Sequence, residues 1–200
     1  MTDGTAPPVV FVGAGLKCFE LTERDIPALQ RFFDANPEYF HSVSGQAPRL
    51  QEAQSEFDEL PPPGMSFKKK WLLGVVDDKG DMQAMANVLS DFLAPHVFHI
   101  GLFIVASSLH GTGVSRAIYD ELERWMISLG ARWVRLGVVK GNAKAESFWT
   151  RLGYEEVRER AGIEMGERIN TVRVMVKALF PALRRADYLE LVSRDQPGAE

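Results

Sequence analysis

The chain has 200 residues, of which 46% are hydrophobic and 25% charged, a composition typical of one folded domain with its own core. Its net charge of −4 gives no reason to expect nucleic acid or a membrane as a partner, because both favour clustered positive charge. Cys18 alone can form neither an intramolecular disulfide nor a thiolate metal site. We therefore expect a cytoplasmic, metal-free single domain over residues 1–200, with frayed tails at 1–8 and 194–200.

The first half of the chain predicts strands and short helices. Gly13 and Gly15 interrupt the first apolar run and indicate a bulge or turn, and Pro37 interrupts a helical pattern. In chain order we expect a strand over residues 9–21, a helix over 22–36, a looser segment to residue 45, a helix over 49–60, and strands over 71–77 and 82–93.

The second half alternates buried strands with helices, which predicts a parallel βαβ arrangement within a mixed sheet. The apolar face of the last helix is expected to pack on its own domain or against a second copy in a homodimer. The expected elements are strands over residues 97–105, 133–139, 154–159 and 171–179, and helices over 114–129, 143–152 and 181–192.

A short glycine-bearing loop, residues 106–113, joins the buried strand 97–105 to the amphipathic helix that follows. Such a loop points backbone N–H groups to the place where the unpaired amides and positive dipole end of the helix also point. Gly111 and Gly113 lack Cβ atoms, so an anion can approach the backbone closely. The loop therefore predicts a phosphate site, although such turns also occur only to satisfy strand-to-helix geometry.

A second motif, residues 141–154, follows the strand 133–139. Asn142, Ala145, Phe148, Gly153 and Tyr154 resemble the N-x-x-A-x-x-F-Y-x-x-x-G-F signature of the GNAT superfamily of acetyl-CoA-dependent N-acetyltransferases, with Trp149 in place of the usual tyrosine. The earlier loop resembles the family's R/Q-x-x-G-x-G/A signature, with His110 in the R/Q place, Gly113 at the first glycine and Ser115 at the second.

The resemblance implies an α/β (α+β) fold: a mixed, mostly antiparallel sheet of about seven strands, splayed between the fourth and fifth, with helices on both faces. It implies that acetyl-CoA is the co-substrate, with its pantetheine arm between the splayed strands and its diphosphate on the loop amides. Asn142 either bonds the pantetheine arm or caps its helix, or does both. The residues that this resemblance places against the cofactor are Phe103, Ile104, Val105, His110, Gly111, Thr112, Gly113, Val114, Ser115, Arg116, Asn142, Ala145 and Trp149.

Acetyl transfer to an amine needs a base, because an amine with a pKa of about 10.4 is mostly protonated at pH 7. Alternation along the strand 97–105 places His99 on one face with Gly101, Phe103 and Val105, and family members similarly carry a Glu or His base near this position. His99 is therefore the predicted base, with His96 and Asp91 as substitutes. Its alternative role is that of a hydrogen-bonded histidine of the core or sheet edge.

The general acid is left open by the sequence, because the indole of Trp149 does not release its proton near neutral pH. The thiolate can leave unprotonated or take a proton from water, Ser147 or Tyr119. The expected activity is acetylation of a primary amine of a small molecule or peptide by direct attack in a ternary complex. The alternatives are a CoA-binding sensor or partner-binding module without turnover, and an acyltransferase for a longer acyl group.

The acceptor side carries an acidic run, Glu52, Glu56, Asp58 and Glu59, with no basic residue among residues 51–60. Negative charge there would attract a cationic amine. The same residues equally describe the solvated face of an ordinary helix.

Overall fold

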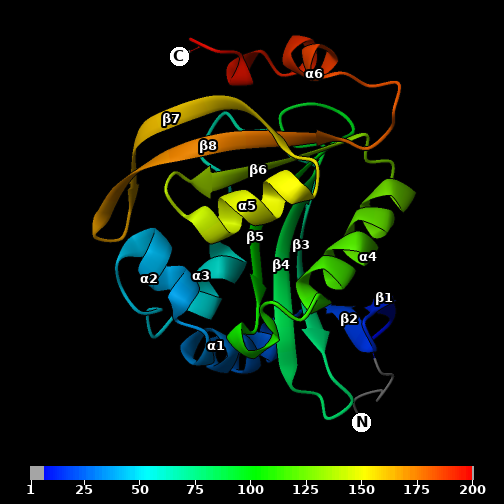
Figure 1. Ribbon diagram of the computed structural model, residues 1–200. Coiled ribbons are helices and arrows are strands. Elements are labelled where there is room, and N and C mark those ends of the chain that lie inside the picture. Colours follow the sequence, from blue (N-terminus) through cyan, green and yellow to red (C-terminus); the bar gives the residue numbers. More distant parts are fainter. Residues whose placement is uncertain (1–6, 200) are drawn as a thin grey trace.

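The computed structural model describes residues 7–199, which form a single eight-stranded sheet in the order β1-β2-β3-β4-β5-β6-β8-β7 (Figure 1). β5 and β6 are parallel, and every other neighbouring pair is antiparallel. This confirms the expected mixed, mostly antiparallel sheet. The strands are β1 (Val9–Gly13), β2 (Leu16–Glu20), β3 (Lys69–Val76), β4 (Met82–Ser90), β5 (Val97–Val105), β6 (Trp133–Val139), β7 (Glu155–Met165) and β8 (Arg168–Ala178).

Helices cover both faces of the sheet, as expected. The helices are α1 (Ile26–Ala35), α2 (Glu38–Ser44), α3 (Glu52–Asp58), α4 (Val114–Ser128), α5 (Ala143–Arg151) and α6 (Arg185–Leu191). α4 and α5 pack with the largest apolar cluster on one face, while α1, α2 and α3 cover a second cluster on the opposite face (Figure 1). α6 covers a third cluster beside the second. No helix within residues 7–199 is long and apolar enough to cross a membrane.

The first apolar run is a hairpin rather than one interrupted strand, so the sheet has one strand more than expected. Ala14 and Gly15 have φ values of 53° and 77°, the backbone that a tight two-residue hairpin turn requires. A Cβ on Gly13 would lie 2.9 Å from Glu121 Cγ of α4. The glycines therefore supply both the turn and the close approach of a helix.

Residues 38–44 form α2, which the sequence analysis treated as a looser segment. Pro37 begins this helix rather than only ending the previous one, because its fixed φ of −71° suits a helix start. Phe40 then packs edge-on against Phe33 of α1, with ring centroids 5.1 Å apart. Main-chain carbonyls near the end of α2 accept hydrogen bonds from Arg168 and Asn170 of β8, which attaches α2 to the β7–β8 hairpin.

Within the described residues, the segment from Arg194 to Ala199 is attached to the fold, where a frayed tail was expected. Ser193–Asp195 form a 3₁₀ turn, and Asp195 is 0% exposed because its carboxylate pairs with Arg135 of β6. α6 packs on its own domain through Tyr188 and Val192. Of the expected tails, residues 1–6 and 200 lie outside the described residues.

Candidate active site

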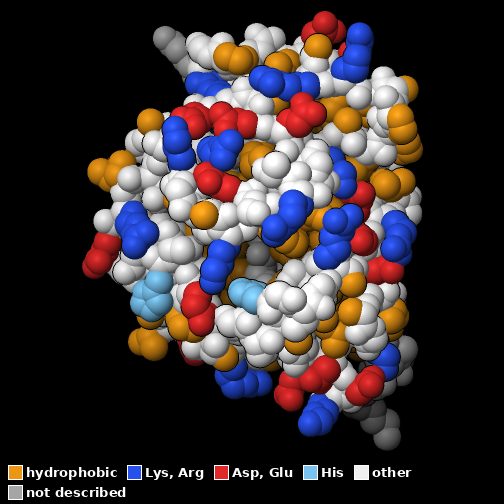
Figure 2. Space-filling view, in the orientation of Figure 1, with side chains coloured by type: hydrophobic (Ala, Val, Ile, Leu, Met, Phe, Trp, Pro, Cys, Tyr) orange, Lys and Arg blue, Asp and Glu red, His pale blue; other side chains and the backbone are white. Residues whose placement is uncertain are grey.

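The parallel strand pair β5–β6 opens partway along its length. β5 and β6 are in register from Val97–Trp133 to Ile100–Leu136, and beyond these residues no further pair forms, although β5 runs on to Val105 and β6 to Val139. Each strand keeps its other neighbour, β4 or β8. The splay expected from the resemblance is therefore present, and Figure 2 shows the surface hollowed between α5 and the loop that precedes α4.

β5 carries a bulge where the splay begins. Its register with β4 runs Asn87–Leu102 and then Val88–Ile100, so Gly101 has no partner. The bulge shifts the alternation of side chains: Phe98 and Ile100 before it, and Phe103 and Val105 after it, all face the α4–α5 cluster. The prediction that His99 shares a face with Phe103 and Val105 is therefore wrong, because His99 points to the opposite side of the sheet.

The backbone of β5 faces the opening at two residues. Ala106 donates to Gln83 O on β4, so antiparallel alternation turns Leu102 and Ile104 toward β4, and Phe103 and Val105 toward the splay. Ile104 therefore presents no main-chain polar group to the opening, contrary to expectation. The Val105 carbonyl is 3.0 Å from His110 Nε2, which donates to it. Phe103 presents both an N–H and a C=O.

The loop before α4 presents a group of unpaired amides. Among residues 7–199, the N–H groups of Gly111, Gly113, Ser115 and Arg116 have no protein acceptor. Gly111 and Gly113 have φ values of 78° and 87°, and no atom lies within 4 Å of where a Cβ would stand on either. These unpaired amides lie at the start of the 15-residue helix α4, where its dipole adds positive potential. This is the geometry of an anion site.

The Thr112 hydroxyl turns inward instead and donates to Leu109 O at 2.7 Å. Arg116 pairs with Asp120 at 3.3 Å on the exposed surface, a bond of about 0–1 kcal/mol that an anion can displace. Val114 and Ser115 form the first turn of α4. The loop and this first turn therefore combine backbone donors with one movable cation.

Asn142 caps α5, as one of its two expected roles required. Its Oδ1 accepts from Ala145 N at 3.2 Å, and its Nδ2 donates to Ser42 Oγ at 3.3 Å. The residue thus joins the start of α5 to α2. Both of these contacts are to protein groups, so the bond of Asn142 to the pantetheine arm stays a prediction.

Trp149 lies in an aromatic cluster under α4 and α5, where it is 8% exposed. Its ring contacts Phe103 at 5.8 Å and Tyr119 at 5.6 Å between centroids. Tyr119 is 0% exposed, and burial raises its pKa far above the ordinary value while its hydroxyl is bonded to Glu123 and Tyr154. Tyr119 therefore does not fit the role of proton donor. Ser147, the other candidate donor, is exposed on α5.

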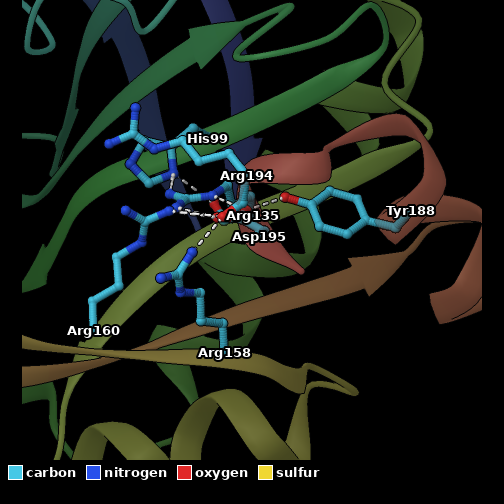
Figure 3. A network of polar contacts seen from close by, with 7 residues as sticks. All are labelled: His99, Arg135, Arg158, Arg160, Tyr188, Arg194 and Asp195. Carbon is cyan, nitrogen blue, oxygen red and sulfur yellow. Dashed lines mark hydrogen bonds and ion pairs between the residues drawn. The ribbon is translucent and has the colours of Figure 1, made fainter. Parts of the chain in front are cut away.

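His99 joins the network that holds the C-terminal segment on the sheet (Figure 3). Its Nδ1 lies 3.1 Å from Arg135 O, and its ring stacks on Phe92 at 4.5 Å. Burial, together with the Arg135 charge, lowers the pKa of His99 to about 3. The geometry fits the alternative role, a hydrogen-bonded structural histidine, better than that of a base.

The substitutes His96 and Asp91 lie in the β4–β5 turn, at the end of β5 away from the splay. Asp91 accepts from His96 N at 2.8 Å, and His96 Nδ1 lies 2.9 Å from Gly130 O. The turn uses both residues, and neither reaches the opening.

Two exposed glycines, which were not among the predicted site residues, lie where β5 and β6 separate. Gly101 of β5 and Gly137 of β6 are exposed, although their strands are otherwise almost entirely buried. Asn87 of β4 lies against Gly101, and Glu56 of α3 accepts from Asn87 Nδ2 at 2.5 Å. A lone glycine within each of two apolar strands was the available signal, because such glycines often mark bulges or close approaches.

The splayed parallel pair and the loop before α4 both lie within one stretch of the chain, residues 29–154. Residues 29–154 match the model of the acetyltransferase (GNAT) family. This match spans more than half of the chain. The protein therefore belongs to the GNAT acetyltransferase family.

Solved structures show the same fold. A GCN5-related N-acetyltransferase from Kribbella flavida is 24% identical, with 82% of this chain and 98% of that chain covered and a TM-score of 0.61. A spermidine N-acetyltransferase from Vibrio cholerae, in complex with CoA and spermine, is 15% identical, with 82% and 96% covered and a TM-score of 0.63. The ribosomal-protein-S18-alanine N-acetyltransferase from Escherichia coli is also 15% identical, with 85% and 97% covered and a TM-score of 0.61. No curated protein matches the chain.

Proposed function

We propose that the protein transfers the acetyl group of acetyl-CoA to a primary amine of a small molecule or peptide by direct attack in a ternary complex. The observation that carries this proposal is the end of the β5–β6 ladder at Ile100–Leu136 while both strands continue. An opening in the middle of a sheet gives an extended chain of amides main-chain partners that an ordinary surface lacks.

The pantetheine arm fits this opening as a short added strand. Phe103 N–H and C=O face it from β5. We assign the other wall to Asn142 and Ala145 at the start of α5, as the family resemblance implies. Because His110 already occupies the Val105 carbonyl, Phe103 supplies the main pairing, and an arm that reaches Val105 must displace the imidazole. Trp149 supports this wall from the core and packs against Phe103.

The diphosphate fits the loop and helix start that follow β5. The unpaired N–H groups of Gly111, Gly113, Ser115 and Arg116 lie there at the positive end of the α4 dipole, and the exposed Arg116 guanidinium belongs to the first turn of the same helix. Charge-assisted bonds of this kind are about twice as strong as neutral ones.

Bound acetyl-CoA supplies an activated acyl group on a thiol leaving group. A thiol of pKa about 8.5 leaves readily as thiolate, so a buried Trp149 in the usual tyrosine place does not by itself prevent turnover. Deprotonating an amine of pKa about 10.4 at pH 7 costs about 4.6 kcal/mol, which makes a proton acceptor near the amine the greater need. Orientation of both substrates in the opening contributes the remaining acceleration.

Calorimetry with acetyl-CoA and desulfo-CoA, followed by thiol release across a panel of amines, tests the proposal. The panel contains a monoamine, a diamine, an α-amino acid and a peptide with a free N-terminus. We expect binding of both CoA compounds and acetyl-CoA-dependent thiol release with at least one amine. Binding without thiol release would favour a sensor, and no binding would remove both functions.

A further inference from the structure

One member of the acidic run, Glu56, differs from the others in its surroundings. Glu52 pairs with Arg49 at 2.8 Å, Asp58 accepts from Gln54, and Glu59 is exposed. The side chain of Glu56 instead points at the sheet and meets Asn87 of β4. Docking of α3 on the sheet has therefore turned one carboxylate of four toward the splay.

The neighbours of Glu56 leave it incompletely paired. Oε1 accepts from Asn87 Nδ2, whereas Oε2 accepts no hydrogen bond within residues 7–199. Lys70 of β3 is the nearby cation, but its ammonium group donates to the main-chain carbonyls of Glu56, Phe57 and Glu59 at the end of α3. The carboxylate thus has a free oxygen and no direct ion pair.

Asn87 adds a second unused acceptor. Because its amide nitrogen faces the carboxylate, its Oδ1 points away, and this buried oxygen has no partner among the described residues. Leaving a buried acceptor unpaired costs about 1–3 kcal/mol, so a ligand that donates to it is favoured. A Cβ placed on Gly101 would lie 3.5 Å from Asn87 Nδ2 and 3.8 Å from Oδ1. Asn87 therefore borders the exposed Gly101, where the splay begins, and its amide nitrogen holds the Glu56 carboxylate beside it.

Two acceptor oxygens that receive no hydrogen bond are suited to a group that only donates, such as an ammonium ion. We propose, on the basis of the proposed function, that Glu56 and Asn87 seat the ammonium group of the acceptor over Gly101 and that Glu56 is the catalytic residue that takes its proton. The site selects cationic primary amines over neutral alcohols, because a hydroxyl brings one donor and no charge.

The chemistry balances with one proton on Glu56. The ammonium N–H bond breaks and its proton passes to Oε2, and the nitrogen lone pair then forms a C–N bond to the thioester carbonyl. Collapse of the tetrahedral adduct breaks the C–S bond, and the thiolate leaves with the electron pair. The second nitrogen proton passes to the thiolate or to water, which gives an amide and the free thiol.

The charges around Glu56 suit this role. Burial raises the pKa of its carboxyl above the ordinary value, and the charges of Glu59 and Glu52 on α3 act in the same direction; the Asn87 hydrogen bond and the Lys70 charge oppose them. Tyr39 of α2 lies near the same group, and burial followed by the charges of Glu56 and Glu52 raises its pKa, so Tyr39 stays neutral. A raised carboxyl pKa lies closer to the pKa of the amine, which makes the proton transfer less unfavourable.

The test compares Glu56→Gln with Glu59→Gln, an exposed charge removal on the same segment. With the best amine of the panel, we expect Glu56→Gln to lower kcat/KM at pH 7 about 100-fold. The Kd for acetyl-CoA should not change, and Glu59→Gln should resemble the parent. The log of kcat/KM for Glu56→Gln should rise with unit slope up to the pKa of the amine, so that the deficit shrinks near pH 10, where free amine is abundant.

Gly101→Ala gives a second measurement that does not alter the carboxylate. Its Cβ would stand at ordinary contact distance from Asn87, so folding should persist, but the methyl group would take the place of the ammonium. We expect a raised KM for the amine with unchanged acetyl-CoA affinity. Suppose that the parent acetylates an amine. If Glu56→Gln then matches the parent in kcat/KM across pH, or Gly101→Ala leaves the KM for the amine unchanged, the role of Glu56 and Asn87 is refuted while the proposed function stands. If the parent acetylates no amine, the proposed function fails with it.

Discussion

Replacement of Asp195 by asparagine tests the network that fixes the C-terminal segment. The Asp195 carboxylate is 0% exposed and accepts from Arg135 Nε at 2.7 Å, Arg160 Nη2 at 3.3 Å and the Tyr188 hydroxyl at 2.6 Å. Asparagine keeps the shape and one acceptor, but it leaves the Arg135 guanidinium, with 8% of its side chain exposed, without a counter-ion. An uncompensated buried charge costs about 3–5 kcal/mol.

For a chain of this length, that loss corresponds to a drop in Tm of about 6–20 °C, at about 2–4 °C per kcal/mol. The effect should depend on pH. Burial opposes ionisation of Asp195, but the Arg135 and Tyr188 bonds and the arginine charges outweigh it and hold its pKa below the ordinary 3.8. A carboxyl with a depressed folded-state pKa stabilises the fold above its unfolded pKa and loses that contribution as the pH falls through the folded pKa.

Guanidinium unfolding of the parent and of Asp195→Asn at pH 7 and at pH 3 measures both effects. Glu190→Gln is the control, because it removes an exposed charge from the same helix, α6. We expect a large difference for Asp195→Asn at pH 7 that narrows at pH 3, and a near-zero difference for Glu190→Gln. A difference below about 0.5 kcal/mol at pH 7, the size typical of surface substitutions, would refute the reasoning.

Three further outcomes are expected. Gly113 has a φ of 87°, so alanine there adds about 1–2 kcal/mol of backbone strain but no charge. In calorimetry, Gly113→Ala should keep most of the CoA affinity, whereas Gly113→Glu should lose at least 100-fold. If the two variants lose the same amount of CoA affinity, the diphosphate binds elsewhere. His99→Gln should leave the pH profile of kcat/KM unchanged, because a pKa of about 3 keeps His99 neutral at assay pH. If the variant instead loses an acidic limb of that profile, His99 is the base. Cys18 is 0% exposed, and burial raises its pKa to about 12. A disulfide reagent should therefore label no thiol in the native protein and one thiol per chain in guanidinium. Rapid labelling of the native protein would contradict the burial of Cys18.

The sequence by itself determined the elements that depend on local pattern. The apolar runs that became β5 and β6 were predicted with the bounds that the structure shows, and the amphipathic spacing behind α4 was equally clear. The two glycine-bearing motifs identified the family, because they hold backbone geometry that few other residues permit. Where the signal was a single proline, at Pro37, the prediction missed a helix that depends on packing against α1.

Only the tertiary structure decided which side chains face the opening. The bulge at Gly101 exists in the register between β4 and β5, and it turned His99 away from the face that simple alternation assigns to it. Glu56 stands apart from the other acids of its run only because α3 docks its side chain against Asn87, 31 positions away. The buried Asp195 carboxylate is paired with Arg135, which lies 60 positions away in the sequence. Periodicity reports which residues are apolar, but contacts between distant segments fix the phase of a strand and the partner of a charge.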